Sequence, residues 1–198
     1  MRGLGLVLAA VVMAMSTAAQ ARPKWALVAH GGAGVIERED LSPEQEKAYR
    51  AAMARVATAA AEVLKAGGSA LDAVETAIRQ MEDDPLFNAG RGAVFAANGR
   101  NELDSSIMDG SNLQAGAVAG VTTVRHPISL ARAVMEKSPH VFLMGEGAEA
   151  FAKSRDLERV QPGYFFTERR WRSLERELKR QGLPIPPRPA GAPAAGAA

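Results

Sequence analysis

The sequence predicts an α+β fold, in which helices cluster around a mainly antiparallel sheet. Two kinds of signal support this prediction: capping residues mark the starts of several helices, and short apolar runs bounded by glycine turns mark strands. Two strand candidates follow each other directly through a hairpin turn instead of alternating with helices. This order favours a layered α+β architecture over a doubly wound parallel sheet.

The helices are predicted from their first residues. Two capping boxes pair a serine with a polar residue three positions later, namely Ser42 with Gln45 and Ser69 with Asp72. Gly67 and Gly68 end the first of these helices. The predicted helices cover 43–65, 70–81, 127–137 and 146–155, and a further helical segment begins at Glu168.

The strand candidates are short runs rich in apolar and β-branched residues. Asn98-Gly99 is the strongest hairpin signal, because the favoured two-residue turns need positive φ at their central residues. Asp109-Gly110 predicts another turn. The predicted strands cover 25–29, 93–97, 105–108, 114–124 and 141–144. We expect the second, third and fourth of these to pair in an antiparallel sheet.

The N-terminus is typical of a secretory signal peptide over residues 1–21. Arg2 precedes an apolar run from Leu4 to Met15, and Ala19-Gln20-Ala21 supplies the cleavage pattern. A membrane-spanning helix needs about 20 residues, so this run is too short to be one, and an uncleaved interfacial anchor is the alternative. We therefore expect a secreted, periplasmic protein. Because the chain has no cysteine, we expect neither a disulfide nor a lipid anchor.

Residues 22–181 are long enough for one domain with its own core. Residues 182–198 are rich in Pro, Ala and Gly and are predicted to be a linker or a disordered tail. The net charge of +2 argues against nucleic acid as a partner. Residues 168–188 carry seven Lys or Arg against three Glu. Because Trp171, Leu174 and Leu178 fall at helical spacing, we interpret these charges as a solvated helix face rather than a phosphate-binding patch.

The most informative stretch runs from Asp84 to Gly110, where glycines and carboxylates are concentrated. It opens with a loop, Pro-Leu-Phe-Asn-Ala-Gly-Arg-Gly, over residues 85–92. Leu86 and Phe87 can anchor this loop, and its glycines allow backbone geometry that other residues resist. Such a loop can aim carbonyl oxygens at a cation or hold a neighbouring catalytic group. It contains no nucleophile.

Histidines and glycines restrict the other site chemistries. The three histidines, His30, His126 and His140, do not stand at metal-ligand spacing, so a zinc site is disfavoured. Residues 30–34, His-Gly-Gly-Ala-Gly, are similar to the oxyanion glycines of esterases. An esterase also needs a Gly-x-Ser-x-Gly elbow, which the sequence lacks. Taken alone, residues 30–34 are equally well explained as a tight turn after a strand.

Six segments in a fixed order carry a resemblance to one family. They are HGGAG at 30–34, PLFNAGRGAVF at 85–95, ELDSSIMDG at 102–110, AGAVAGV at 115–121, RHPISLARAVMEKSPHV at 125–141 and GEGAEAFA at 145–152. Together they resemble the plant-type L-asparaginase or isoaspartyl peptidase family. The resemblance extends from about Trp25 to Val160.

The resemblance implies an N-terminal-nucleophile hydrolase with an αββα sandwich, made as a precursor that cuts itself into an α chain and a β chain. The nucleophile is the threonine that begins the β chain, with its own α-amine as base. It hydrolyses L-asparagine and isoaspartyl (β-aspartyl) dipeptides. This sequence stops before the Gly-Thr-Val-Gly junction of the family. We therefore expect it to be the α half, with no catalytic residue of its own and no activity alone.

The resemblance also implies a set of supporting residues. Asn88 points toward the nucleophile, its alternative being a turn residue that bonds its own backbone. Gly31 and Gly32 lie near the active threonine and affect maturation. A structural sodium ion is bound by main-chain carbonyls, which suits a hard cation. The implied sodium ligands are the carbonyl oxygens of Met81, Glu82, Asp84, Phe87, Ala89 and Arg91.

The implied partners are a β chain and a second αβ unit, giving an (αβ)2 assembly that acts on a small amino-acid or dipeptide substrate. No organic cofactor, nucleic acid or membrane partner is expected. The alternative is a secreted, non-catalytic remnant that keeps the α-half scaffold and acts as a binding or pairing module. A threonine junction encoded next would distinguish the two.

Overall fold

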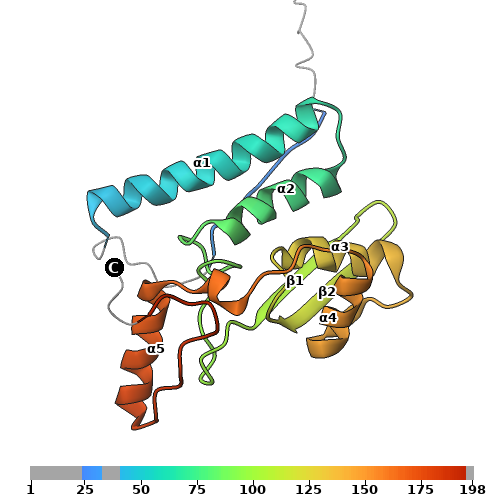
Figure 1. The fold of residues 1–198 in the computed structure, drawn as a ribbon. Coiled ribbons are helices and arrows are strands. Elements are labelled where there is room, and N and C mark those ends of the chain that lie inside the picture. The colour runs from blue at the N-terminus through green and yellow to red at the C-terminus, as the bar shows by residue number, and fades with distance from the viewer. Residues whose placement is uncertain (1–23, 33–40, 195–198) are drawn as a thin grey trace, which may run out of the picture.

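The computed structural model describes residues 24–32 and 41–194 (Figure 1). The expected signal peptide, residues 1–21, lies outside the described residues, and so do Ala33 and Gly34 of the His-Gly-Gly-Ala-Gly segment. No helix within the described residues is both long enough and apolar enough to cross a membrane.

The first two helices form a pair that packs side by side (Figure 1). They are α1 (Pro43–Lys65) and α2 (Ala70–Asp83), and both begin at the predicted capping boxes. Ser42 Oγ accepts from the Gln45 N–H at 3.2 Å, and Ser69 Oγ accepts from the Asp72 N–H at 3.1 Å. Their contact, here called the α1/α2 cluster, is built mostly from alanines, which allow close approach. It contains Ala52, Val56, Ala60, Ala73, Ala77, Met81 and Phe87.

Three strands form one mixed sheet in the order β1-β2-β3. The strands are β1 (Leu103–Met108), β2 (Ala115–Val121) and β3 (Phe142–Met144). β1 and β2 are antiparallel and place Ile107 opposite Gly116. β2 and β3 are parallel, with Ala117 opposite Phe142, because α3 (Pro127–Lys137) carries the chain back across the sheet between them.

One face of the sheet is covered by α3 and α4 (Gly145–Ser154). Their contact forms the sheet cluster, in which Ile107, Val118 and Leu130 are buried. Each such side chain contributes roughly 1.5–3 kcal/mol through burial. Gly116 lets β2 touch α3, since a Cβ there would lie 2.1 Å from the Ala131 carbonyl oxygen.

The opposite face of the sheet is open, and it carries several exposed apolar side chains beside the polar Asp104 and Ser106 of β1. The side chains that point there include Met108, Phe142 and Met144, which are 56%, 49% and 65% exposed. Phe142 and Met144 alternate with half-buried Leu143, which packs on the sheet cluster, as the two-residue period of a strand requires. Exposed apolar side chains grouped on one sheet face are typical of an interaction surface. We call this group the open sheet face.

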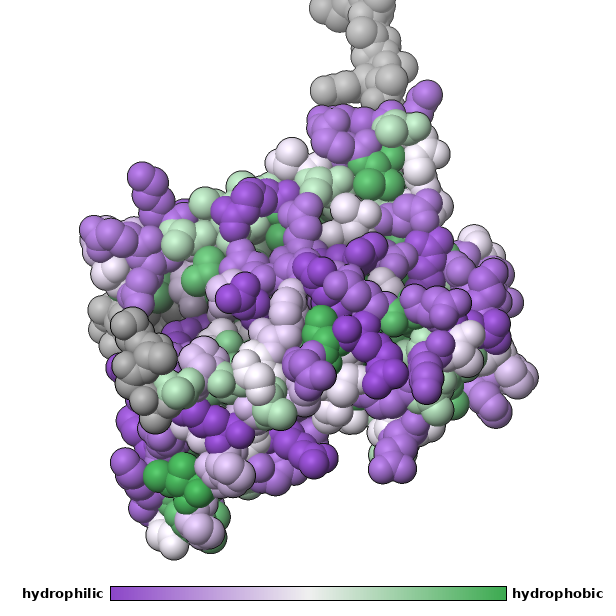
Figure 2. All heavy atoms as spheres, viewed as in Figure 1, coloured by the Kyte–Doolittle hydropathy of each residue, from purple (hydrophilic) through white to green (hydrophobic). Residues whose placement is uncertain are grey.

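The last helix, α5 (Glu168–Gln181), follows the short 3-10 helix η2 (Pro162–Phe165) and builds a third core. The predicted apolar positions of α5 are all buried, in an α5 cluster of Phe95, Phe166, Trp171, Leu174 and Leu178. In Figure 2, hydrophilic residues cover much of the visible face, over α1 included, and hydrophobic ones form scattered patches. Residues 182–194 contain no helix or strand, but the Gly163 N–H donates to the Ala190 carbonyl oxygen at 2.8 Å.

Two predicted strands do not form among the described residues. Residues 25–29 belong to no sheet, and Val28 is 94% exposed. Residues 93–97 pair with no strand, although the predicted Asn98-Gly99 turn is present and the Ala96 N–H donates to the Arg100 carbonyl oxygen at 2.8 Å. These predictions were wrong because strand propensity describes a residue's fit to a pleated surface and does not say whether a neighbouring strand exists.

A short stretch of chain contributes to all three cores. Phe87 belongs to the α1/α2 cluster, Ala93 to the sheet cluster and Phe95 to the α5 cluster. The loop predicted to carry function therefore lies where the three cores meet. In Figure 1 it connects the end of α2 to the sheet and passes close to the start of α5.

Candidate functional site

The site loop, defined here as residues 84–94, begins directly after α2 and folds back on the end of that helix. The Arg91 N–H donates to the Glu82 carbonyl oxygen at 2.7 Å, which closes the loop. Inside it, the Leu86 N–H donates to Asp84 Oδ1 at 3.0 Å, and Phe87 is buried. As predicted, an apolar side chain anchors the loop.

Two glycines allow main-chain carbonyls to crowd into the loop. Gly90 has φ +44°, and a Cβ there would lie 2.3 Å from the Glu82 carbonyl oxygen. Gly92 has φ +116°, and a Cβ there would lie 2.7 Å and 2.8 Å from the carbonyl oxygens of Pro85 and Phe87. A side chain at either position is therefore excluded by both space and backbone conformation.

Behind the loop, the end of α2 is joined to the start of α3 by a buried carboxylate. Glu82 is 3% exposed, and its Oε1 accepts from the Ile128 N–H at 2.9 Å. Its Oε2 shares a hydrogen bond of 3.2 Å with Nδ1 of the buried His126. Burial raises the pKa of the Glu82 carboxyl, and the hydrogen bonds from His126 and Ile128 offset this only in part. The side chain thus ties together two helices.

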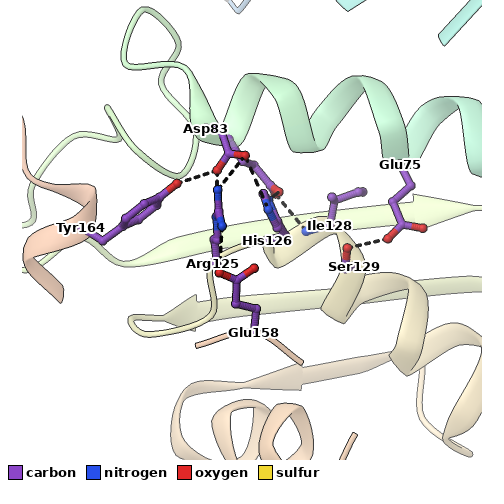
Figure 3. Close-up of polar contacts among 9 residues, drawn as sticks. Glu75, Asp83, Arg125, His126, Ile128, Ser129, Glu158 and Tyr164 are labelled. Carbon is purple, nitrogen blue, oxygen red and sulfur yellow. Dashed lines mark hydrogen bonds and ion pairs between the residues drawn. The ribbon is translucent and has the colours of Figure 1, made fainter. Parts of the chain in front are cut away.

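The next residue, Asp83, extends this connection to η2 (Figure 3). Its Oδ1 accepts from the Tyr164 hydroxyl at 2.6 Å and from Arg125 Nε at 3.1 Å, and its Oδ2 accepts from Arg125 Nη2 at 3.2 Å. Arg125 also reaches Glu158 at 2.8 Å. Burial opposes ionisation of Asp83, but the bonds from Tyr164 and Arg125 outweigh it and lower the pKa of this carboxyl. Tyr164 and Arg125 therefore hold the last residue of α2, directly before the site loop begins.

A cavity of about 910 Å³ lies between the site loop, α1, the start of α5 and the segment around Gly31. It brings together the three residues predicted to support the nucleophile, because Asn88 meets Gly31 and Gly32, which are more than 50 positions earlier in the sequence. Its lining also includes His30, Leu41, Glu46, Tyr49, Arg50, Met53, Met81, Leu86, Phe87, Ala89, Val94, Arg169 and Arg170.

In the side-chain amide of Asn88 the oxygen is hydrogen-bonded and the nitrogen is free within the described part of the chain. Its Oδ1 accepts from the Val94 N–H at 2.9 Å, which is the local bond expected of a turn residue. Its Nδ2 donates to none of the described residues. Asn88 is exposed at the cavity, so its amide remains available to a group outside the described chain.

The two glycines at the cavity differ in what they require. Gly32 has φ +116°, a conformation that favours glycine, and its N–H donates to His30 Nδ1 at 3.2 Å. At Gly31 a Cβ would lie 3.1 Å from Met53 Sδ and 3.8 Å from the Phe87 ring. Gly32 is therefore restricted by its backbone, whereas a side chain at Gly31 would require only a small shift of Met53.

The predicted sodium ligands lie at a place that suits a hard cation. Met81 and Glu82 are in the last turn of α2, where the helix dipole leaves the carbonyls partly negative. The Glu82 carbonyl lies beside Gly90 and the Phe87 carbonyl beside Gly92, and a carbonyl oxygen has two lone pairs with which to accept. No group of three or more His, Cys, Asp or Glu side chains within the described ranges could hold a metal ion. A cation here would therefore depend on main-chain oxygens.

Sequence reasoning missed several residues that support the site. The side chains of Glu82, Asp83 and His126 carry no signal in the sequence, because their partners are 42 to 81 positions away along the chain. Sequence reasoning also read Arg169 and Arg170 as part of a solvated face, although both contact the site loop. Helical spacing shows which face of a helix is apolar, but it does not show which other segments the residues beside that face contact.

Comparisons with known proteins agree with these motifs. The asparaginase family model matches residues 23–185. An isoaspartyl peptidase of Salmonella typhimurium is 48% identical over 169 residues, covering 82% of this chain and 54% of the relative. An isoaspartyl peptidase of Escherichia coli K12 is 50% identical over 151 residues, covering 76% and 47%. A plant-type L-asparaginase of Pyrococcus furiosus is 45% identical over 157 residues, covering 79% and 50%.

The chain spans about half the length of these curated relatives. The matched residues include α1, α2, the whole sheet, the site loop and α5. Because the family model covers most of the sequence, the chain belongs to the asparaginase family.

Proposed function

We propose that this chain is the α half of a self-processing amidohydrolase that acts on L-asparagine and isoaspartyl dipeptides. The observation that carries the proposal is the cavity in which Asn88, Gly31 and Gly32 meet beside the site loop. Relatives named isoaspartyl peptidase or L-asparaginase, 45–50% identical over about four fifths of the chain, support the same reaction class.

The nucleophile of this reaction is a threonine at the start of a β half. Its hydroxyl attacks the side-chain amide carbon of asparagine, its α-amine takes the hydroxyl proton, and ammonia leaves as an ester forms. Water then cleaves the ester and releases aspartate. The threonines of the described chain, Thr58, Thr76, Thr122, Thr123 and Thr167, are all internal residues whose α-nitrogen is part of a peptide bond, so none offers a free α-amine. This chain's part is to shape and support the site.

Asn88 is the residue of this chain that we place next to the threonine. Its free Nδ2 can donate a hydrogen bond, and its Oδ1 is held by the Val94 N–H, so the direction of the amide is fixed. Gly31 and Gly32 line the same cavity, and because they lack side chains they would leave room for the incoming β chain. A sodium ion on the carbonyls of Met81, Glu82, Asp84, Phe87, Ala89 and Arg91 would neutralise their partial charges and stiffen the site loop.

The open sheet face supports a two-sheet architecture. A β half that supplies a second sheet would cover Met108, Phe142 and Met144 and complete an αββα sandwich. Pairing of two such αβ units would give the (αβ)2 assembly. Residues 1–21 would direct the precursor to the periplasm.

The test is to supply a β half in trans. Residues 22–198 are co-produced with a C-terminal half that begins with threonine, either encoded next in the gene or taken from the Salmonella typhimurium relative. We expect a stable complex that releases aspartate from L-asparagine and from a β-aspartyl dipeptide. A stable complex without release of aspartate would instead favour the binding-module alternative, and failure to pair would reject the α-half assignment.

Asn88→Ala tests the site within that complex. We expect the rate of aspartate release to fall roughly 100-fold, the usual cost of losing one well-placed donor. The matched control is Asn98→Ala, because Asn98 also bonds its own loop, through Oδ1 to the Arg100 N–H at 2.9 Å, but lies outside the cavity. Equal activity of the Asn88 variant and the wild type would show that Asn88 has no role in the reaction.

A further inference from the structure

The first turn of α5 is joined to both ends of the site loop by hydrogen bonds. Arg169 Nη2 donates to the Pro85 carbonyl oxygen at 3.0 Å. Arg170 Nε donates to the Gly92 carbonyl oxygen at 2.7 Å. The two residues are neighbours in α5, and they reach carbonyls on opposite sides of Asn88. The loop is thus spanned by one rigid element.

Arg170 is placed at an energetic cost. Its guanidinium is half-buried, and burial together with the charge of Arg169 lowers the pKa of Arg170. Among the described residues no carboxylate forms an ion pair with it, whereas Arg172 and Arg180 on the same helix pair with Glu168 and Glu177. Partial burial of a cation whose hydrogen-bond partner is a neutral carbonyl costs folding free energy. This cost suggests that the contact between Arg170 and the site loop has a function.

α5 itself is well fixed, so it can act as a support. Thr167 caps its first turn, and Trp171 is 1% exposed within the α5 cluster. Arg188, from the segment after the helix, lies 4.9 Å from the Phe166 ring centroid and bonds Glu168 at 3.1 Å. The start of α5 is therefore held from its own core and from residues beyond its end.

We propose that Arg170, assisted by Arg169, is a positioning residue that holds the site loop, and with it Asn88, in the conformation the site needs. Both side chains line the cavity and act through main-chain carbonyls of the site loop. This proposal rests on the function proposed above only for its effect on turnover. Its structural part, that α5 fixes the loop, stands independently.

Hydrogen exchange of the loop amides tests the structural part. In the full chain, Arg170→Ala removes one charge-assisted hydrogen bond, and we expect the amides of residues 91–94 to exchange roughly 10- to 100-fold faster. Arg170→Lys keeps the charge without the planar fork, so its exchange should be intermediate. Arg172→Ala is the matched control, because this exposed arginine of the same helix does not contact the loop.

The outcomes separate this proposal from the proposed function. Wild-type exchange in Arg170→Ala, equal acceleration in Arg172→Ala, or acceleration spread over the whole sheet would overturn the positioning role. In a complex with a β half, Arg170→Ala should lower kcat while KM for L-asparagine stays within about twofold. Faster exchange with unchanged kcat would reject the link to turnover. A wild-type complex without activity would reject the proposed function and leave the exchange result valid.

Discussion

Glu82 and His126 share a hydrogen bond of 3.2 Å in the buried contact between α2 and α3, and both side chains are less than 8% exposed. The same carboxylate accepts from the Ile128 N–H at the start of α3. One side chain therefore satisfies two donors that would otherwise be buried without a partner. This arrangement fixes the helix end from which the site loop departs.

We expect Glu82→Ala to lower the free energy of unfolding by about 2–6 kcal/mol, because it leaves two buried polar groups, the His126 ring nitrogen and the Ile128 N–H, without their partner. Glu82→Gln keeps one acceptor oxygen and should cost about half as much. Glu158→Ala is a control from the same region, since this half-exposed partner of Arg125 should cost less than about 1 kcal/mol. Urea denaturation of the three variants gives the comparison. Similar losses in all three would contradict a special role for Glu82.

Gly90→Ala and Gly92→Ala should each distort the site loop, because a Cβ would come within 3 Å of main-chain carbonyl oxygens. We expect a loss of about 1–3 kcal/mol in the free energy of unfolding for each. Gly147→Ala is the matched control, since Gly147 lies in α4 with open space around its Cβ position. That variant should be unchanged or slightly stabilised. Thermal unfolding measures all three, and a tolerated Gly90→Ala would mean that the loop can relax.

Acid should weaken the end of β2 through Glu149. This carboxylate accepts from the Thr122 and Thr123 N–H groups at 2.6 and 2.8 Å and from the Thr123 hydroxyl. Burial opposes its ionisation, but these hydrogen bonds outweigh burial and hold the pKa of Glu149 below its ordinary value. Because the folded pKa is the lower one, the stabilisation is complete above the unfolded pKa of about 4.3 and is lost as the pH falls through the folded value.

We therefore expect the stability difference between wild type and Glu149→Gln to be constant near neutral pH and to shrink below about pH 4. Thr123→Val removes a donor and brings the folded pKa of Glu149 closer to the unfolded one, so the loss of stability in acid should be smaller than in the wild type and complete at a higher pH. Unfolding free energies measured from pH 7 to pH 3 would show this. If the stability difference between wild type and Glu149→Gln grew on acidification, the pKa of Glu149 would be raised by folding and not lowered.

The open sheet face should make the isolated chain self-associate. Replacing Phe142 and Met144 by threonine keeps strand propensity and removes exposed apolar surface, so the double variant should be more soluble and more monomeric by light scattering. The same variant should pair less well with a β half. Leu183→Ser, which changes an exposed apolar residue beyond α5, is the control and should alter neither property. A monodisperse wild-type monomer would show that the face needs no cover.

Local signals in the sequence predicted the helices well. Ser42 and Ser69 mark helix starts because their hydroxyls bond backbone N–H groups only three residues away, and such contacts can be read from the sequence directly. The strands were harder to predict, since residues 25–29 and 93–97 have strand-like composition but no partner among the described residues. The parallel direction of β3 follows from the α3 crossover rather than from its own residues.

The candidate site was predictable only in part. The glycines and Asn88 stand out because their residue types are unusual in one short segment, and the family resemblance placed them at one site. Arg170 and Glu82 do not stand out, because an arginine on a charged helix and a glutamate at a helix end are ordinary. Their roles come from contacts with residues distant in the chain, which depend on the packing of the whole fold.

The site loop contributes Phe87 and Ala93 to two of the cores, and Phe95, the residue directly after it, belongs to the third, so the conformation of the loop depends on all three. A substitution that loosens any one core removes a support from the loop, even when the changed residue is far from the cavity. Mildly destabilised variants should therefore lose the conformation of the site loop at temperatures where the bulk of the chain is still folded. A selective constraint on the loop then extends to the packing of all three cores.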